Sequence, residues 1–167
     1  MKRAIVTGGA GFVGTNLIKH LLSKYPDIEI MSIDNYFTGK KENHVDSPNV
    51  DYKRMNTWHI NRLTEIEMFK PDVVFHFGEY SRIVKSFDDV DYVQRSILSA
   101  TPIILDLCRK WGAKLIYSAS SSKFGNGGKD ENLSPYSWCK SKMVELLKNY
   151  NNWFNLKYRF QLCCLPT

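Results

Sequence analysis

The sequence predicts an α/β fold in which helices cover both faces of a doubly wound parallel sheet. Short apolar runs alternate with longer stretches of helical periodicity along the chain. A glycine-rich turn joins the first apolar run to the first helical stretch. Because a right-handed crossover passes over a face of the sheet, this alternation favours parallel strands with helices on both sides.

Four elements are expected in the first half of the chain. Residues 3–7 form an apolar run rich in Ile and Val, and residues 12–24 have the spacing of an amphipathic helix. Apolar runs at 28–33 and 72–77 predict two more buried strands. The polar stretch 34–49 between them is typical of a loop.

The second half continues the alternation. A helical pattern covers residues 84–111, where Pro102 must either kink the helix or mark a new first turn. A strand is expected at 114–117, a loop rich in Ser and Gly at 118–134, and a helix at 136–154. No repeat or linker divides the chain, so residues 1–167 are interpreted as one domain.

Composition excludes several classes of protein. The chain is 43% hydrophobic and 24% charged, and no apolar run is long enough to cross a bilayer. Glycines interrupt the apolar N-terminal stretch, which argues against a signal peptide and predicts a cytoplasmic protein. The net charge of +6 is scattered rather than gathered, so nucleic-acid binding is not expected.

Cysteine spacing supports neither a disulfide framework nor a metal site. Free buried thiols are the expectation for the four cysteines, which are Cys108, Cys139, Cys163 and Cys164.

The turn after the first predicted strand has the spacing Gly-x-x-Gly-x-x-Gly, from Gly8, Gly11 and Gly14. Glycines there permit a tight turn and let the backbone approach a pyrophosphate at a helix N-terminus. Asp34 follows Gly14 by 20 residues, at the end of the second predicted strand. Its carboxylate can accept hydrogen bonds from ribose hydroxyls and repel a 2′-phosphate, so NAD is favoured over NADP. The alternative is that the glycines only shape a turn and Asp34 only caps a loop.

A second set of polar residues follows the strand predicted at 114–117. Ser120 lies in the loop, and Tyr136 and Lys140 lie one helical turn apart. A nearby ammonium favours the phenolate and lowers a tyrosine pKa, which suits proton exchange near neutral pH. Such a pair is often only a solvated surface pair, but ligands bind beyond the carboxyl ends of parallel strands, where both residues are expected.

These motifs together resemble the NAD-dependent epimerase/dehydratase group of the extended short-chain dehydrogenases, typified by UDP-glucose 4-epimerase. The resemblance covers nearly the whole chain. Its matching segments are residues 7–14, 34–39, 72–76, 118–125 and 135–140.

The resemblance implies roles for individual residues. Ser120 would hydrogen-bond the reacting oxygen, Tyr136 would be the acid/base, and Lys140 would hold the nicotinamide ribose while polarising Tyr136. His76, buried in a strand, is interpreted as structural, although its side chain could titrate near physiological pH. The residues expected to contact NAD are Gly8, Gly11, Phe12, Val13, Gly14, Asp34, Asn35, Asn56, Thr57, Phe77, Gly78 and Lys140.

The implied activity is that of a nucleotide-sugar epimerase, with a UDP-sugar favoured as the substrate. A sugar hydroxyl would be oxidised transiently and the hydride returned to the opposite face. Two alternatives stay open: a non-catalytic NAD-binding fragment or subunit, and a nucleotide-sugar dehydratase or reductase. Family dehydratases usually carry an acidic residue where Ser121 and Ser122 stand, which favours the epimerase. A homodimer through residues 84–111 and 136–154 is also implied.

The sequence departs from the family pattern in several places. Ser96 and Ser99 replace an asparagine and a glycine, and Asn56 replaces an aspartate beside adenine, so weaker cofactor contacts are expected. The span from Ser120 to Tyr136 is also shorter than in many members. After Arg159 the pattern is lost, and the C-terminal substrate-binding lobe is expected to be missing, which would abolish sugar specificity and turnover.

Overall fold

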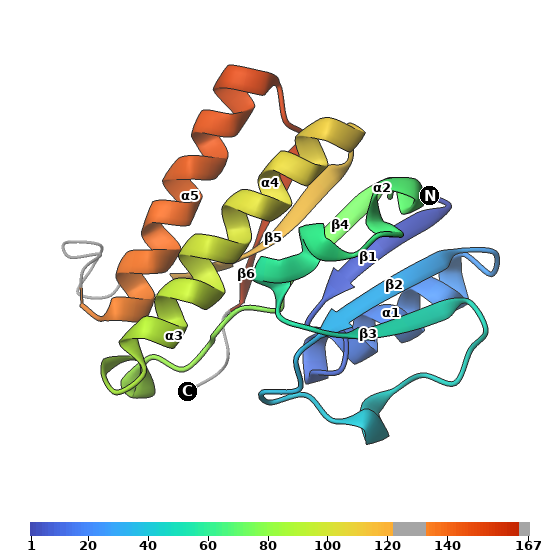
Figure 1. Cartoon of the computed structure of the whole chain (residues 1–167), viewed down its shortest axis with the longest axis horizontal. Helices are drawn as coiled ribbons and strands as arrows, with labels where there is room; N and C mark the ends of the chain where they lie inside the picture. The colour runs from blue at the N-terminus through green and yellow to red at the C-terminus, as the bar shows by residue number, and fades with distance from the viewer. Residues whose placement is uncertain (122–132, 164–167) are drawn as a thin grey trace.

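The computed structural model describes the backbone of residues 1–121 and 133–163, with side chains through Phe160. Its centre is a six-stranded sheet in the order β3-β2-β1-β4-β5-β6 (Figure 1). Every neighbouring pair of strands is parallel. The strands are β1 (Arg3–Thr7), β2 (Glu29–Asp34), β3 (Val50–Arg54), β4 (Val73–His76), β5 (Lys114–Ser120) and β6 (Tyr158–Cys163). The doubly wound parallel sheet expected from the sequence is confirmed.

Apolar side chains on alternate faces of the strands form two separate cores. Ile5 of β1 belongs to one core, whereas its neighbours Ala4 and Val6 belong to the other. In register, Ile5 lies between Met31 and Val74. Because side chains alternate along a strand, both faces of the central strands are buried, which is why these strands are apolar runs.

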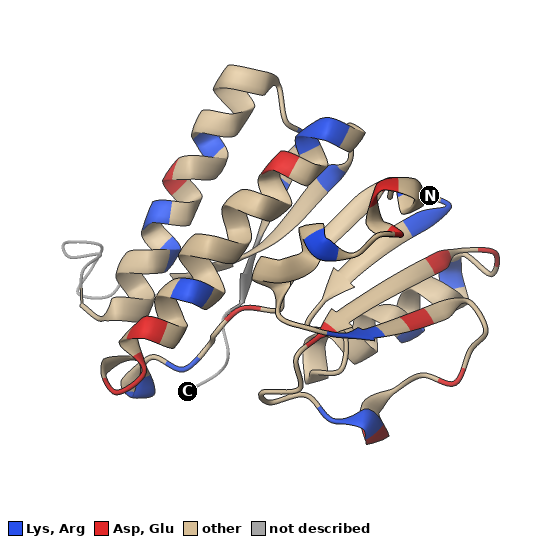
Figure 2. Cartoon of the chain, viewed as in Figure 1, with Lys and Arg blue, Asp and Glu red and all other residues tan. Residues whose placement is uncertain are grey.

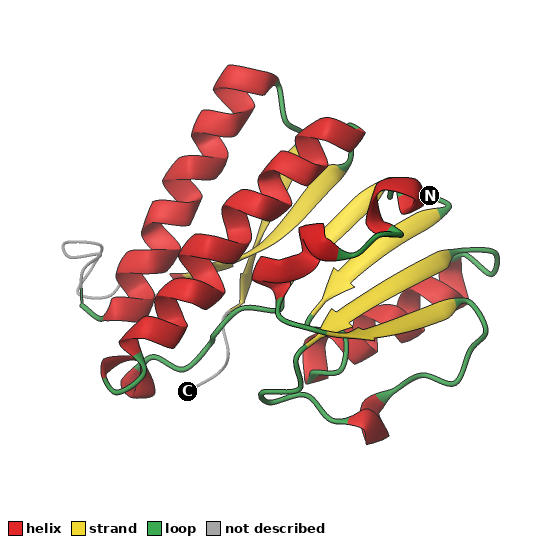
Figure 3. Ribbon diagram, in the orientation of Figure 1, coloured by secondary structure: helices red, strands yellow, loops and turns green. Residues whose placement is uncertain are grey.

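Helices lie on both faces of the sheet (Figures 1 and 3). Helix α1 (Phe12–Lys24) buries Ile18 and Leu21 against β1 and β2. Helices α4 (Ala100–Trp111) and α5 (Pro135–Phe154) pack on the opposite core. Helix α5 begins where Ser134 accepts a hydrogen bond from the Ser137 backbone, with Pro135 in the first turn. Shorter elements are η1 (Lys41–Asn43), η2 (Thr57–Arg62), α2 (Ile66–Phe69) and η3 (Val84–Phe87).

The helix expected over residues 84–111 is not one regular helix. The turn η3 is separated from α3 (Val90–Gln94) by two residues, and a π-helical turn, η4 (Arg95–Ser99), joins α3 to α4. Pro102 lies just after η4, in a helix that runs without a break from α3 through η4 into α4. A new first turn is therefore not observed. The helix is instead distorted by a π-helical turn, the kind of irregularity that accompanies the missing N–H of a proline.

Three other expectations need correction. Strands β3 and β6 were not expected, and they add one strand to each side of the sheet. The predicted loop 118–134 begins too early, because β5 continues to Ser120. The rest of that loop, at 122–132, lies outside the described residues, as does the divergent ending at 164–167.

Charged residues of both signs are interspersed along the chain, in helices, strands and loops (Figure 2). Cys108 and Cys139 are buried free thiols, as expected, whereas the side chains of Cys163 and Cys164 lie outside the described part. No helix in the described ranges is long and apolar enough to cross a membrane.

Candidate functional site

The turn between β1 and α1 packs backbone against backbone. Gly8 has a φ of 74°, a conformation that favours glycine. A Cβ on Gly14 would lie 2.2 Å from the Gly8 carbonyl oxygen, and a Cβ on Gly78 would lie 2.7 Å from the Gly8 nitrogen. The turn after β4 therefore approaches the glycine turn so closely that neither side has room for a side chain.

A cavity of about 290 Å³ opens beside this turn, at the carboxyl ends of β1, β2 and β4. Its size is at the lower end of the range of small-molecule sites. Ten of the residues expected to contact NAD line it: Gly8, Gly11, Phe12, Val13, Gly14, Asp34, Asn35, Thr57, Phe77 and Gly78. Asn56 and Lys140 are not among the lining residues.

Asp34 presents a mostly buried carboxylate to the cavity, with 8% of its surface exposed. One oxygen accepts a hydrogen bond from Ala10 N at 3.0 Å and the other from Tyr36 N at 2.8 Å. A carboxylate has about four acceptor positions, so further donors can still bind. The two backbone bonds fix its direction at the end of β2.

The side chains of Asn35 and Asn56 are joined by a hydrogen bond. The Asn35 amide donates to Asn56 Oδ1 at 2.8 Å and to the Tyr92 hydroxyl at 2.7 Å, and its oxygen accepts from Phe37 N at 2.9 Å. Asn56 therefore supports the cavity wall through Asn35. The hydroxyl of Ser96, another cavity residue, accepts from Tyr80 N at 2.8 Å, while Ser99 is exposed.

Aromatic side chains form one wall of the cavity. Phe37 stacks on Tyr92 with ring centroids 4.7 Å apart, and Trp58 meets Tyr92 edge-on at 5.7 Å. Tyr80 packs edge-on against the same ring at 5.9 Å. This wall was not predicted, because its members come from segments without a common motif.

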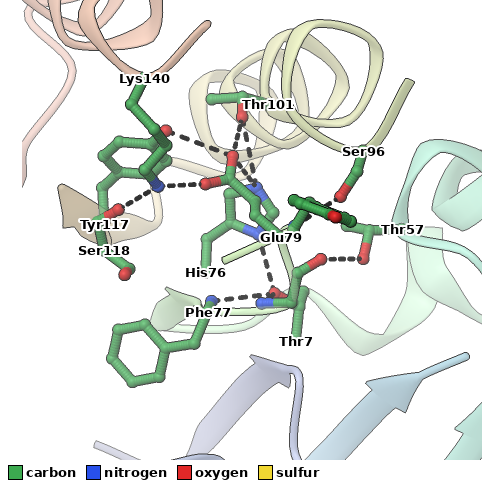
Figure 4. Close-up of polar contacts among 12 residues, drawn as sticks. Thr7, Thr57, His76, Phe77, Glu79, Ser96, Thr101, Tyr117, Ser118 and Lys140 are labelled. Atoms are coloured by element: carbon green, nitrogen blue, oxygen red, sulfur yellow. Dashed lines mark hydrogen bonds and ion pairs between the residues drawn. The ribbon is translucent and has the colours of Figure 1, made fainter. Parts of the chain in front are cut away.

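Lys140 is enclosed in a buried polar network (Figure 4). Its ammonium donates to Glu79 Oε2 and to the Ser118 carbonyl, and it lies 4.4 Å from the centre of the Tyr117 ring. Glu79 also accepts hydrogen bonds from Thr101 and, at 3.2 Å, from the Tyr117 hydroxyl. The exposed fractions of the Lys140 and Glu79 side chains are 4% and 3%.

His76 connects this network to the glycine turn, and its protonation follows from its partners. The Thr7 hydroxyl oxygen accepts from Phe77 N at 3.1 Å and Gly78 N at 2.9 Å. Both lone pairs are thereby used, so the Thr7 hydroxyl donates to His76 Nδ1, 2.7 Å away. His76 is then neutral with its proton on Nε2, which faces Glu79 Oε1 at 3.2 Å. It is fully buried, in line with the structural interpretation.

The charges in this network stabilise each other. Burial alone would raise the pKa of Glu79, but the charge of Lys140 and the hydrogen bonds from Lys140 and His76 outweigh it and hold that pKa well below its usual range. Burial would likewise lower the pKa of Lys140, but the facing Glu79 carboxylate raises it above its ordinary value. Burial, assisted by Glu79, raises the pKa of Tyr117. Both members of the ion pair are therefore charged at neutral pH.

Tyr136 and Ser120 lie at the same edge of the sheet. Tyr136 is the second residue of α5 and is 9% exposed, and Ser120 is the half-buried last residue of β5. Tyr136 is close enough to Lys140 to contribute to its raised pKa. Neither residue lines the cavity formed by the described residues, and Ser122 lies outside them.

Comparison with known proteins gives this site its context. The profile described as "NAD dependent epimerase/dehydratase family" matches residues 4–165. The chain belongs to this family. Members that it resembles include ADP-L-glycero-D-manno-heptose-6-epimerase of Brachyspira hyodysenteriae, 31% identical over 125 residues, and UDP-glucuronic acid decarboxylase 4 of Arabidopsis thaliana, 29% identical over 128 residues.

Each alignment covers 74% of this chain, but only 38% of the epimerase and 27% of the decarboxylase. Among solved structures, UDP-glucose 4-epimerase of Thermus thermophilus in complex with NAD is similar, with a TM-score of 0.80 and 27% identity. That similarity covers 95% of this chain and 53% of the other. The chain thus spans about half the length of this solved relative.

Sequence reasoning about the epimerase/dehydratase family missed Glu79. The one local signal is its position just after β4, three residues from His76. A second signal is Lys140 itself, since a lysine on the buried side of a helix needs an acceptor of opposite charge. The four partners of the Glu79 carboxylate come from β4, α4, β5 and α5, so only the folded chain shows the network.

Proposed function

We propose that this chain binds NAD in the cavity and carries the redox half-site of a nucleotide-sugar epimerase. The observation that supports it best is the joint placement of a side-chain-free cradle and an acidic residue. Gly8, Gly14 and Gly78 pack backbone against backbone and also line the cavity, so a ligand would meet backbone there, and the Asp34 carboxylate faces the same cavity. A pyrophosphate fits the first feature and a ribose diol fits the second.

The proposed chemistry divides between cofactor and protein. When bound, NAD supplies a reversible acceptor for a hydride from a sugar carbon. Tyr136 accepts the proton of the sugar hydroxyl and later returns it, while Ser120 orients the same oxygen by a hydrogen bond. Lys140 stabilises the phenolate of Tyr136 by its charge.

The proposed substrate is a nucleotide sugar, with a UDP-sugar favoured. The similar proteins support this class, since they include an ADP-L-glycero-D-manno-heptose-6-epimerase, a UDP-glucuronic acid decarboxylase and a UDP-glucose 4-epimerase. The homodimer through residues 84–111 and 136–154 stays a prediction.

Cofactor binding is tested first, by calorimetric titration of the 167-residue chain with NAD and with NADP. We expect NAD to bind more tightly, and Asp34→Ala to weaken NAD binding by about tenfold or more, because a charged acceptor of ribose hydroxyls is lost. Asp27→Ala is the matched control, since Asp27 is exposed and precedes β2 at the opposite edge of the sheet.

Equal affinity for NAD and NADP, or an Asp34→Ala variant that binds NAD as well as Asp27→Ala does, would contradict the assignment of Asp34. Absence of NAD binding to the unchanged chain would contradict the proposed function itself.

Turnover is tested by adding UDP-sugars to the NAD-loaded chain and following NADH absorbance. Tyr136→Phe is expected to slow NADH formation by about 10²- to 10⁴-fold, because the acid/base group is removed. Tyr150→Phe, on the same helix, should leave the rate unchanged. NADH formation at the same rate in Tyr136→Phe would refute this role, and NAD binding without any NADH would favour the non-catalytic alternative.

A further inference from the structure

The buried carboxylate of Glu79 is in direct contact with the lysine of the candidate site, yet the proposed reaction does not call for it. Glu79 also lines the cavity beside the glycine turn, next to Gly78. It therefore lies between the cavity and Lys140, which does not line the cavity. A charged side chain in this place affects how Lys140 can meet a ligand.

The ammonium group of Lys140 has three hydrogens to donate. Glu79 Oε2 and the Ser118 carbonyl accept two of them. The ring of Tyr117 lies below the nitrogen at 4.4 Å from its centre. Among the described residues these are the two oxygen acceptors of the ammonium, so one hydrogen remains for a group that enters the site.

The carboxylate of Glu79 is held as firmly as the ammonium. Oε1 accepts from Thr101, from His76 and from Tyr117, so only Oε2 serves Lys140. His76 in turn is fixed by Thr7 in the strand that enters the glycine turn. Glu79 therefore cannot turn away from Lys140 without breaking hydrogen bonds to β4, β5 and α4.

We propose that Glu79 is a positioning residue for Lys140, which it holds against Ser118 so that a single N–H points to the bound ligand. Lys140 then acts on Tyr136 through its charge, while its remaining hydrogen bond goes to a hydroxyl of the ligand. The part of this proposal that concerns the ligand rests on the proposed function, whereas the part that concerns Lys140 alone does not.

The charge of Lys140 depends on Glu79 because both side chains are almost fully buried. The titratable groups that face the pair are His76 from β4, Tyr117 from β5, and Tyr136 and Cys139 from α5. Helix α4 contributes only the neutral hydroxyl of Thr101. With the carboxylate removed, burial dominates and the pKa of Lys140 should fall.

The test is a titration of Lys140 by NMR of the chain with labelled lysine side chains, in parallel with NAD titrations over the same pH range. In the unchanged chain, Lys140 should stay protonated above the ordinary pKa of lysine. Glu79→Gln should lower the pKa of Lys140 by about one unit or more. NAD affinity of that variant should fall about tenfold as pH rises through the lowered pKa.

Two further variants separate charge from packing. Tyr117→Phe removes a donor to the same carboxylate but keeps the Glu79 charge and the ring. Because Glu79 raises the pKa of Lys140 more than Tyr117 does, this variant should shift the Lys140 titration clearly less than Glu79→Gln. Glu79→Asp keeps the charge on a shorter side chain, so it should keep Lys140 protonated.

Several outcomes would overturn the proposal. If Lys140 in the unchanged chain titrates at or below the ordinary pKa of lysine, the proposal is wrong, and this measurement needs no variant to fold. The proposal is also wrong if Tyr117→Phe shifts the pKa of Lys140 as much as Glu79→Gln shifts it. Absence of NAD binding contradicts the proposed function but leaves the titration of Lys140 as an independent test of Glu79.

Discussion

Lys140→Met is expected to lower the free energy of unfolding by about 3–5 kcal/mol, because it leaves the buried Glu79 carboxylate without its cation. The side chains of both residues are almost fully enclosed, so water cannot replace the missing partner. The double variant Glu79→Gln/Lys140→Met should recover much of this loss, since no charge is left in the core. The amide oxygen that replaces the carboxylate would still offer an acceptor to Thr101 and His76. Urea unfolding of the two single variants and the double variant measures the coupling.

The effect of Lys140→Met should depend on pH. The pKa of Glu79 is lowered from 4.5 to about 2, so its stabilising contribution is present above the unfolded value and is lost as pH falls towards 2. The pKa of Lys140 is raised above 10.5, so its contribution is present below that value and is lost at higher pH. The loss on Lys140→Met should therefore be full near neutral pH and shrink in acid.

Lys142→Met is the control for Lys140→Met. Lys142 forms an exposed ion pair with Glu145 at 3.3 Å, and such pairs contribute about 0–1 kcal/mol. Equal losses of unfolding free energy in Lys140→Met and Lys142→Met would contradict a stabilising buried ion pair. The same conclusion would follow if Glu79→Gln/Lys140→Met lost as much unfolding free energy as its two single variants together.

Gly14→Ala is expected to abolish measurable NAD binding and to destabilise the fold by about 1–3 kcal/mol, the usual cost of overpacking. The added Cβ would lie 2.2 Å from the Gly8 carbonyl oxygen and 2.6 Å from the Gly9 Cα. Both are backbone atoms, so the whole turn has to move. Thermal unfolding and NAD titration measure the two effects.

Gly11→Ala is the comparison for Gly14→Ala within the same turn. Its Cβ would lie 3.3 Å from the same carbonyl oxygen, so a shift of a few tenths of an ångström relieves the contact. Its effect on unfolding should be clearly smaller. If Gly14→Ala were as stable as Gly11→Ala, the backbone around Gly14 would not be as closely packed as the structure shows, and the prediction would be wrong.

The central strands could be predicted from the sequence, whereas the outer strands could not. Strands β1, β2, β4 and β5 bury apolar residues on two faces and read as apolar runs. Strand β3, at one edge of the sheet, has no fully buried residue and carries charged side chains between its apolar ones. Strand β6 likewise mixes arginine and glutamine with apolar residues. The outer strands therefore could not be recognised as apolar runs, because charged and polar residues interrupt them.

The same distinction holds at the site. Gly8, Gly14 and Asp34 could be predicted because a turn and a strand end are local features with fixed spacing. The role of Glu79 could not, because it depends on Lys140, 61 residues away along the chain. The tautomer of His76 likewise depends on Thr7, 69 residues distant.

The π-helical turn η4 has a consequence for how insertions and deletions act on this chain. In a regular α-helix, residues five apart differ by about 140° in direction. The wider turn instead brings Ser96 and Thr101 to the same side, where they bind the neighbouring residues Tyr80 and Glu79. Removing one residue from η4 would restore a regular helix but rotate one of these two hydroxyls out of reach. The length of this segment, and not only its residue types, is thus part of what holds Glu79 beside Lys140.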